Sequence, residues 1–177
     1  MTPPIVLLHG WGLSSAVWAP LQAQLDPQFT ILAPDLPGHG NAAPAGDTLA
    51  SWAEALLAHI PDGSMLVGWS LGAQLAMHLA VHAPQKIARL VLIAASPRFV
   101  QADNWPAALP EATLEEFRSH FELDPDATQR RFVALQSLGD AARKHVAARL
   151  GEALTPADTT HLPALATGLR LLAETDQ

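Results

Sequence analysis

The sequence predicts an α/β protein in which a parallel sheet, covered by helices on both faces, is followed by an all-helical segment. Residues 1–95 alternate short apolar runs with amphipathic segments, and no strand-like run follows Ser96. The apolar runs are rich in Val, Ile and Leu without polar alternation, which is typical of strands that are covered on both faces. Strands that alternate with helices indicate a parallel, three-layer arrangement.

Four strands and three helices are expected in the first part of the chain. The strand candidates are the apolar runs Ile5–Leu8, Phe29–Ala33, Met65–Gly68 and Leu90–Ala94. The helix candidates between them are Ser15–Leu25, Thr48–His59 and Leu71–His82. Asp47 is expected to cap the second helix, since its carboxylate can accept from the free N–H groups of the first turn.

The second part of the chain begins with an irregular, Pro-containing connection, "SPRFVQADNWPAALPEA", and continues as helices. Thr113 followed by Glu116 fits a capping box, and Asp124-Pro125 fits an N-cap with proline at the first helical position. The helix candidates are Leu114–Phe121, Pro125–Leu138, Ala141–Leu154 and Leu162–Ala173. We therefore expect a core of residues 1–96 and a helical lid of residues 97–173.

Composition narrows the class of protein. The 177 residues are 49% hydrophobic, which suits one globular domain with a real core. No apolar run approaches the ~20 residues that span a bilayer, and the start "MTPPIVLLHG" lacks the basic segment of a signal peptide. The lack of cysteine excludes disulfides and thiolate metal sites. A cytoplasmic protein without cofactor, metal or membrane partner is expected.

Charge is distributed unevenly along the chain. The net charge of −7 argues against nucleic acid as the main partner. Residues 1–85 contain no Lys or Arg, whereas residues 127–151 contain a local excess of bases. These bases are Arg130, Arg131, Arg143, Lys144 and Arg149. They predict a lid surface that docks an acidic protein, and the alternative is an ordinary solvated helical surface.

The stretch Gly68-Trp69-Ser70-Leu71-Gly72 matches the pattern G-x-S-x-G of a nucleophile elbow. An apolar run precedes it and a helix candidate follows it, so Ser70 is expected in a tight turn at a helix N-terminus. The exposed N–H groups and positive dipole end there favour a developing anion. The alternative is a serine that merely caps an ordinary strand-to-helix turn.

A second motif, His9-Gly10-Trp11-Gly12, follows the first strand candidate. Acyl transfer develops a negative oxygen in the transition state, and two backbone N–H groups must meet it. We expect these donors to come from Leu71, directly after the serine, and from Trp11 in this loop. The alternative is a Gly-rich turn with no chemistry.

The base and the acid that a serine nucleophile needs are harder to place. Asp35 and His39, in "APDLPGHG", both precede Ser70, whereas the usual order in this type of site is Ser, acid, His. A loop-shaping Asp and a packed or solvated His are therefore the favoured interpretation. His78 lies eight residues along the helix that follows Ser70, ~12 Å along its axis, which is beyond the reach of Ser70. His78 and His82 have no apparent third ligand, so a helix-surface pair is favoured over a metal site.

Three further histidines fall in the lid candidate: His120, His145 and His161. Only a large fold-down of the lid could bring one of them within hydrogen-bond reach of Ser70.

The stretches "VLLHGWGLSSAVW", "APDLPGHG" and "LVGWSLGAQLAMHLA" resemble the α/β-hydrolase superfamily. The chain resembles most the pimeloyl-acyl-carrier-protein methyl ester esterases of biotin synthesis, the BioH family. Trp11, Trp69, "ASPRFVQADNWP" and "RRFVALQSLG" carry that resemblance. It implies an α/β-hydrolase fold with a helical lid, and hydrolysis of the methyl ester of a carrier-bound pimeloyl chain. Short simple esters are implied as further substrates.

The resemblance also assigns roles to residues. It implies that Ser70 is the nucleophile, that Trp11 and Leu71 supply the oxyanion N–H groups, and that Trp69 helps to wall the acyl pocket. The lid bases would face the acidic carrier protein. Family members begin with a further strand or two, and after the lid they return to the sheet with two more strands. The loops after those strands carry the triad Asp and then the His, so these two residues and the flanking strands are expected to be missing from this chain.

Three interpretations remain open. The first is an esterase of this family in a shortened form. The second is a related α/β hydrolase that cleaves thioesters or amides. The third is a non-catalytic relative that binds an acyl chain or a carrier protein. The identity of the acyl-pocket residues and the lid would separate the second from the first.

Overall fold

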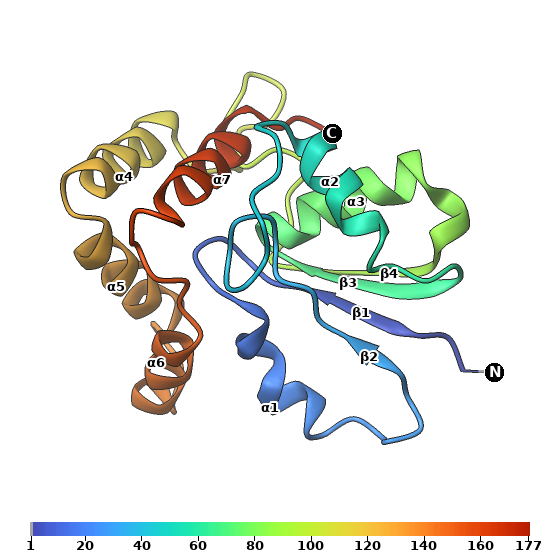
Figure 1. Ribbon diagram of the computed structural model, residues 1–177. Helices are drawn as coiled ribbons and strands as arrows, with labels where there is room; N and C mark the ends of the chain where they lie inside the picture. Colours follow the sequence, from blue (N-terminus) through green and yellow to red (C-terminus); the bar gives the residue numbers. More distant parts are fainter. Residues whose placement is uncertain (1) are drawn as a thin grey trace.

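A computed structural model describes residues 2–177 and shows a four-stranded parallel sheet surrounded by helices (Figure 1). The strands are β1 (Ile5–Leu8), β2 (Ile31–Leu32), β3 (Ser64–Trp69) and β4 (Ile87–Ile93). Their order across the sheet is β2-β1-β3-β4, and all neighbouring pairs are parallel. Each strand overlaps the run predicted for it, and the predicted parallel sheet with helices on both faces is confirmed.

The register of β1 and β3 places two loops next to each other. Leu8, the last residue of β1, pairs with Gly68 of β3. Because parallel strands end at the same edge of a sheet, the loop after β1 and the turn after β3 emerge side by side. The two motifs singled out in the sequence, residues 9–12 and residues 68–72, lie at these strand ends.

Helices cover the two faces of the sheet unequally (Figure 1). One face carries the 3-10 helix η1 (Ser15–Trp18) and α1 (Ala19–Gln22), and the other carries α2 (Leu49–Leu57) and α3 (Leu71–His82). A short 3-10 helix, η2 (Pro84–Lys86), joins α3 to β4.

Two predictions in this part of the chain were wrong. The single helix expected over Ser15–Leu25 is divided, because Pro20 has no N–H with which to continue the hydrogen bonding begun in η1. The N-cap of α2 is Thr48 rather than Asp47: its hydroxyl accepts from Ser51 N–H, and Ser51 Oγ accepts from Thr48 N–H.

The second part of the chain contains α4 (Glu111–Leu123), α5 (Pro125–Gln136), α6 (Arg143–Glu152) and α7 (Leu162–Glu174). Asp124 caps α5 as expected, because its carboxylate accepts from Ala127 N–H. The capping box expected at Thr113 was wrong, since α4 begins two residues earlier, directly after Pro110. Between residues 2 and 177, no helix has both the length and the apolar character needed to cross a bilayer.

The main hydrophobic core lies between the sheet, α2, α3 and the last helix. Leu165, Leu169 and Leu172 of α7 belong to the same buried cluster as Val6 of β1 and Leu71 of α3. A smaller cluster, around Trp18 and Leu7, fills the opposite face. The division into a core of residues 1–96 and a lid of residues 97–173 remains a proposal. Helix α7 falls within the proposed lid by sequence, but its buried side chains belong to the main hydrophobic cluster.

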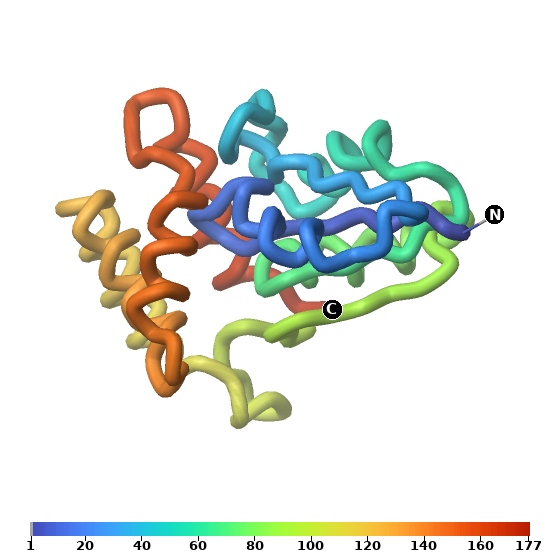
Figure 2. The backbone as a smooth tube through the Cα atoms, turned by 90° about the horizontal axis from the view of Figure 1, so that it is seen from below, coloured from blue at the N-terminus to red at the C-terminus, as the bar shows by residue number. Residues whose placement is uncertain are grey.

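Strand β4 forms an outer edge of the sheet (Figure 2). Among the described residues 2–177, no strand pairs with its outer side. Four consecutive large apolar side chains are each 37–41% exposed here: Leu90, Val91, Leu92 and Ile93. A long apolar edge with unpaired N–H and C=O groups is the feature through which sheets recruit other chains.

We therefore expect the 177-residue chain to self-associate through β4. Replacing Val91 and Ile93 by lysine should shift the chain toward monomer and weaken its binding of a hydrophobic dye, because charges on an edge strand oppose edge-to-edge pairing. Light scattering after size-exclusion chromatography measures the change. Val81→Lys, at a 74% exposed position on α3, is the matched control. A monodisperse wild-type monomer that binds no dye would contradict the prediction.

Candidate active site

Ser70 occupies the turn between β3 and α3 in a strained backbone conformation. Its φ is 54° and its ψ is −117°, although it is not glycine. Such conformations cost of order 1–3 kcal/mol and persist where the surrounding structure enforces them. Here the Ser70 N–H donates to Ile93 C=O at 3.0 Å, and the Ser70 C=O accepts from Ala73 and Gln74 of the first turn of α3. The turn thus holds the side chain at the carboxyl edge of the sheet.

Glycines allow this turn to be tight. A Cβ on Gly68 would lie 2.5 Å from Gly72 C=O, and a Cβ on Gly72 would lie 2.5 Å from the carbonyl oxygens of Leu8 and His9. Contacts this short are not tolerated, so both positions require glycine for close backbone packing. The G-x-S-x-G spacing therefore has a steric cause in this fold.

The loop after β1 lies against the serine. A Cβ built on Gly10 would lie 3.4 Å from Ser70 Cβ. Among the described residues, neither the Trp11 nor the Leu71 backbone N–H donates a hydrogen bond outside regular helix and strand pairing. Leu71 is the first residue of α3, where the N–H has no partner within the helix. In the described part of the chain, the loop after β1 and the start of α3 therefore each contribute one backbone N–H without a hydrogen-bond partner, that of Trp11 and that of Leu71.

The Trp11 side chain joins this loop to the lid. Its ring is 1% exposed and lies edge-on to Phe117, Phe121 and Phe132, with ring centroids 5.4–5.5 Å away. The indole N–H donates to Leu165 C=O at 2.7 Å. A single residue therefore packs against α4, α5 and α7 while its backbone stays beside Ser70. Sequence reasoning selected Trp11 for its backbone and missed this side-chain role.

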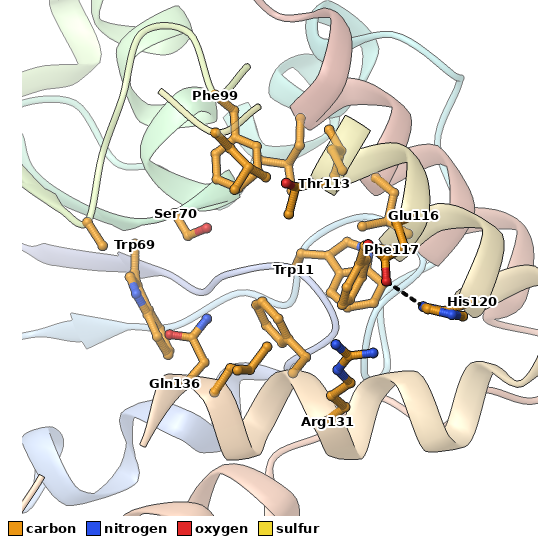
Figure 3. Close-up of a pocket in the computed structure, with 17 residues that line it drawn as sticks. Trp11, Trp69, Ser70, Phe99, Thr113, Glu116, Phe117, His120, Arg131 and Gln136 are labelled. Carbon is orange, nitrogen blue, oxygen red and sulfur yellow. Dashed lines mark ion pairs between the residues drawn. The ribbon is translucent and has the colours of Figure 1, made fainter. Parts of the chain in front are cut away.

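A cavity of about 360 Å³ opens beside Ser70, between the sheet edge and the lid (Figure 3). This size is typical of small-molecule sites. Trp69 and Trp11 both line the cavity. The other apolar lining residues are Ala94, Phe99, Leu109, Leu114, Phe117, Phe132, Leu135, Leu169 and Leu172.

Sequence reasoning missed most of these lining residues. Phe117 and Phe132 belong to the apolar faces of amphipathic helices. Such a face predicts that these side chains are buried, but it does not identify the surface or cavity that they contact. Phe99 and Leu109 lie in the irregular connection, and a short bridge between Val100 and Leu109 folds that connection back on itself. Polar groups enter the cavity wall from Thr113, Glu116, His120, Arg131 and Gln136.

Asp35 and His39 shape the neighbouring loop, as expected. Asp35 accepts from Ser15 N–H at 2.6 Å and from Asn41 N–H at 2.9 Å. Burial alone would raise the pKa of Asp35, but these hydrogen bonds lower it below its usual value. His39 is fully buried and lies edge-on to Trp52.

His9 links the loop after β1 to the loop after β2. Its Nδ1–H donates to Gly10 C=O at 2.8 Å, and its Nε2 accepts from Leu36 N–H at 2.9 Å, which requires a neutral ring. Burial lowers the pKa of His9 to about 4 and that of His39 to about 3. The two histidines are therefore structural groups that stay neutral.

Among the described residues, no hydrogen bond joins a histidine ring to Ser70. His161 uses its two ring nitrogens on Asp158 Oδ1 and Gly40 C=O. His120 lines the Ser70 cavity, but Figure 3 places it at the far end, paired with Glu116 at 4.0 Å. His78 and His82 stack on each other on α3, with ring centroids 4.0 Å apart. Within residues 2–177, no group of three or more potential ligands is arranged to hold a metal ion.

The lid bases are exposed on two helices. Arg130 and Arg131 lie on α5, and Arg143, Lys144 and Arg149 lie on α6. Arg149 forms an ion pair with Glu152 at 3.2 Å. Arg131 differs from the others because it also lines the cavity.

The two buried histidines should make the fold sensitive to acid. In the unfolded chain the two rings become protonated below pH ~6.5. In the folded chain they stay neutral until the pH approaches their lowered pKa values, about 4 for His9 and about 3 for His39. Their contribution is therefore fully present above pH ~6.5 and is lost as the pH falls toward 4. The free energy of unfolding should decrease by roughly 1.4 kcal/mol per pH unit for each histidine.

Chemical denaturation between pH 7.5 and pH 4.5 tests this expectation. His39→Phe keeps a flat ring beside Trp52 and removes one titrating group, so the pH slope should fall to about half. Comparing slopes removes any cost of the substitution that is independent of pH. An unchanged slope in His39→Phe would contradict the assignment.

Comparison with known proteins agrees with the fold and the motifs. A family described as "alpha/beta hydrolase fold" matches residues 3–150. The pimeloyl-acyl-carrier-protein methyl ester esterase of Aromatoleum aromaticum is 47% identical, over 98% of this chain and 72% of that protein. The enzyme of the same name from Vibrio vulnificus is 36% identical, over 98% of this chain and 68% of that protein.

Solved structures of low sequence identity share the fold. An esterase from Exiguobacterium antarcticum superposes with a TM-score of 0.77 at 19% identity, covering 99% of this chain and 67% of that one. A hydrolase from Oleispira antarctica superposes with a TM-score of 0.79 at 17% identity, again covering 99% and 67%. From its family match, its relatives and its sheet, this chain belongs to the α/β-hydrolase family and, within it, to the family of the pimeloyl-acyl-carrier-protein methyl ester esterases.

Proposed function

We propose that the protein is a serine carboxylesterase that hydrolyses the methyl ester of pimeloyl-acyl-carrier protein, in biotin biosynthesis, through an acyl-enzyme at Ser70. The observation that carries the proposal is the strained Ser70 turn, which lies against Gly10 and opens into an apolar cavity. The names of the two relatives supply the substrate. Ester hydrolysis is the activity that such a turn, beside two free backbone donors, supports best.

In the proposed reaction, Ser70 Oγ attacks the ester carbonyl carbon, and the carbonyl oxygen becomes an oxyanion. The Trp11 and Leu71 N–H groups meet that oxygen as its charge develops. Collapse of the intermediate releases methanol and leaves the acyl chain esterified to Ser70. Water then attacks the same carbon, freeing the carboxylic acid and regenerating the hydroxyl. Both steps need a base that takes the proton from the attacking oxygen and then gives it to the leaving oxygen, which is that of methanol in the first step and Ser70 Oγ in the second.

The cavity supports an acyl chain as the substrate portion beside the serine. Its wall is dominated by aromatic and aliphatic side chains, with Trp69 next to Ser70. Methylene groups gain about 0.8 kcal/mol each when they leave water for such a surface. A chain bound there presents its ester to the turn, while its other end points toward the lid.

A second candidate function is binding of an acyl chain or carrier protein without turnover. The observation that favours it is that, in the described part of the chain, no imidazole is hydrogen-bonded to Ser70. Cleavage of thioesters or amides by the same serine is a third, related alternative. The resemblance to α/β hydrolases puts the Asp and His of the triad in a segment beyond the lid.

A direct experiment compares two proteins. One is the 177-residue chain, and the other is an extended chain that continues it with the part of the Aromatoleum aromaticum relative lying beyond the match. The extended chain should release methanol from the carrier-bound methyl ester faster than it cleaves a matched thioester or amide. The 177-residue chain should show at most a residual rate, ~10³–10⁴-fold above the rate in water, from backbone donors and binding alone. Failure of the extended chain to release methanol would overturn the proposal.

The lid bases are proposed to dock the acidic carrier protein. Arg143 and Lys144 are exposed on α6 and do not line the cavity, so their charges are available to a partner. Charges at the rim of an interface act mainly on the association rate and on its salt dependence. Cytoplasmic location and the absence of nucleic-acid, membrane, metal and cofactor partners complete the proposal.

Reversing both charges, as Arg143→Glu with Lys144→Glu, should weaken carrier-protein binding by about tenfold at low salt and by less at high salt. Fluorescence anisotropy of a labelled carrier protein measures this. Hydrolysis of p-nitrophenyl butyrate by the extended chain should be unchanged. Arg143→Glu alone is compared with Arg89→Glu, a control of equal charge change at an exposed position on β4. Equal losses with the control and with the lid variant would count against a docking surface on α6.

A further inference from the structure

Helix α7 approaches the side chains of both residues whose backbone N–H groups lie beside Ser70. At Gly168, in the middle of α7, a Cβ would lie 2.8 Å from Trp11 Cδ1 and 3.3 Å from Leu71 Cδ2, whereas ordinary contacts span 3.4–4 Å. On the same face of the helix, three residues earlier, Leu165 C=O accepts from the Trp11 indole N–H at 2.7 Å. One face of α7 therefore packs directly on Trp11 and Leu71.

The backbone conformation at Gly168 does not require a glycine. Gly168 has no positive φ and lies inside a helix, where alanine is more favourable than glycine. Gly151, near the end of α6, likewise has no positive φ, but a Cβ there would meet nothing within 4 Å. The steric requirement at Gly168 therefore comes from the side chains of Trp11 and Leu71.

These two side chains have little room to move away. The Trp11 and Leu71 side chains are buried, and Figure 3 shows Trp11 between Ser70 and the lid. The rings that enclose Trp11 edge-on are Phe117, Phe121 and Phe132. Because packed interiors transmit strain, a push on the indole displaces its own backbone. That backbone lies in the loop after β1, where a Cβ on Gly10 would lie 3.4 Å from Ser70 Cβ.

From this packing we infer that Gly168 is a positioning residue, whose missing side chain allows the Trp11 and Leu71 N–H groups to stand where the oxyanion forms. The inference rests on the proposed function and adds a residue to it. Backbone donors stabilise an oxyanion only when they lie about 2.7–3.1 Å from it, so displacements of a few tenths of an ångström matter. Gly168 does not line the cavity, so it acts through Trp11 and Leu71 rather than on the substrate.

A methyl group at this position should slow the reaction without weakening ester binding. In the extended chain, Gly168→Ala should lower kcat for p-nitrophenyl butyrate by about 10- to 100-fold and leave KM within about twofold. The cavity wall that holds the ester is unchanged, whereas the donors act on the transition state. Gly151→Ala, the matched control in another helix, should retain both kcat and KM.

Urea denaturation of the 177-residue chain tests the contact without turnover. Gly168→Ala should lower the midpoint in the wild type, because the methyl group meets Trp11 and Leu71. In the Trp11→Ala background it should raise the midpoint, because the methyl group enters the space left by the ring. A change of the same sign and size in both backgrounds would contradict the contact.

Labelling with ¹⁵N-tryptophan observes one of the donors itself. The chain has five tryptophans, so its spectrum contains few backbone amide signals, and the signal that is missing from Trp11→Ala identifies Trp11. That signal should shift in Gly168→Ala and stay in place in Gly151→Ala. An unmoved Trp11 signal in Gly168→Ala would overturn the inference.

Two kinetic results would also overturn it: an unchanged kcat in Gly168→Ala, or equal losses in Gly168→Ala and Gly151→Ala. Should Gly168→Ala fail to fold, the Trp11→Ala background decides, since recovery of folding there supports the contact and continued failure contradicts it. If the extended chain hydrolyses no ester, the urea midpoints and the Trp11 signal still show whether Gly168 positions this donor. The two proposals can therefore fail separately.

Discussion

Replacing Ser70 by alanine is expected to abolish ester hydrolysis by the extended chain, with a loss of up to ~10⁶ in kcat. The reason is that the covalent route depends on Ser70 Oγ, and the two free N–H donors beside it cannot attack an ester. Methanol release from the carrier-bound ester and hydrolysis of p-nitrophenyl butyrate should fall together, because both use the same serine.

Two controls separate chemistry from folding in that experiment. Ser70→Ala keeps the positive φ of 54° at the turn, so its free energy of unfolding should stay within ~0.5 kcal/mol of the wild type. Ser96→Ala, in the connection after β4, removes a hydroxyl outside the cavity wall and should leave activity intact. Activity that survives in Ser70→Ala would mean that another group is the nucleophile.

Replacing Trp11 by alanine is expected to produce the largest loss of stability, about 3–5 kcal/mol. The ring is almost fully buried, it lies edge-on to three phenylalanines, and its N–H satisfies Leu165 C=O. Truncation leaves a cavity between the loop after β1, α4, α5 and α7, and removes the indole hydrogen bond to Leu165 C=O. Since whole domains are stable by only about 5–15 kcal/mol, this is a large fraction of the total.

The midpoint of urea denaturation, followed by far-ultraviolet circular dichroism, measures the effect. Trp11→Phe should cost less than Trp11→Ala, because it keeps the edge-on contacts and loses the indole hydrogen bond. Trp105→Ala, in the exposed connection after β4, should change stability by no more than ~0.5 kcal/mol. Equal effects of Trp11→Ala and Trp105→Ala would show that Trp11 does not fasten the lid.

The parts of the fold that depend on local sequence could be predicted. The strand, turn and helix around Ser70 follow from an apolar run, two glycines and a periodic helix within residues 64–82, and α3 has the predicted bounds Leu71–His82. Asp124-Pro125 likewise determines the start of α5, because the Asp124 carboxylate accepts a hydrogen bond from Ala127 N–H. In each case the interactions that decide the structure lie within a few residues of one another.

Contacts between distant residues could not be predicted in the same way. The Thr155 hydroxyl donates to Leu13 C=O, and the Thr155 N–H donates to Gly12 C=O, which ties the end of α6 to the loop beside Ser70. No local pattern marks Thr155 for that role. The same holds for the contact of Trp11 with Leu165 and for the position of Arg131 in the cavity wall, since both depend on how the lid packs on the sheet.

The central claim, that Ser70 is an activated nucleophile at the end of an acyl cavity, is tested most directly by locating a covalent adduct. The extended chain is treated with a fluorophosphonate probe, digested and analysed by mass spectrometry. One adduct is expected, on the peptide that contains Ser70, and it should form more slowly when monomethyl pimelate occupies the cavity. An adduct on another residue, or labelling of Ser70→Ala at the wild-type rate, would contradict it.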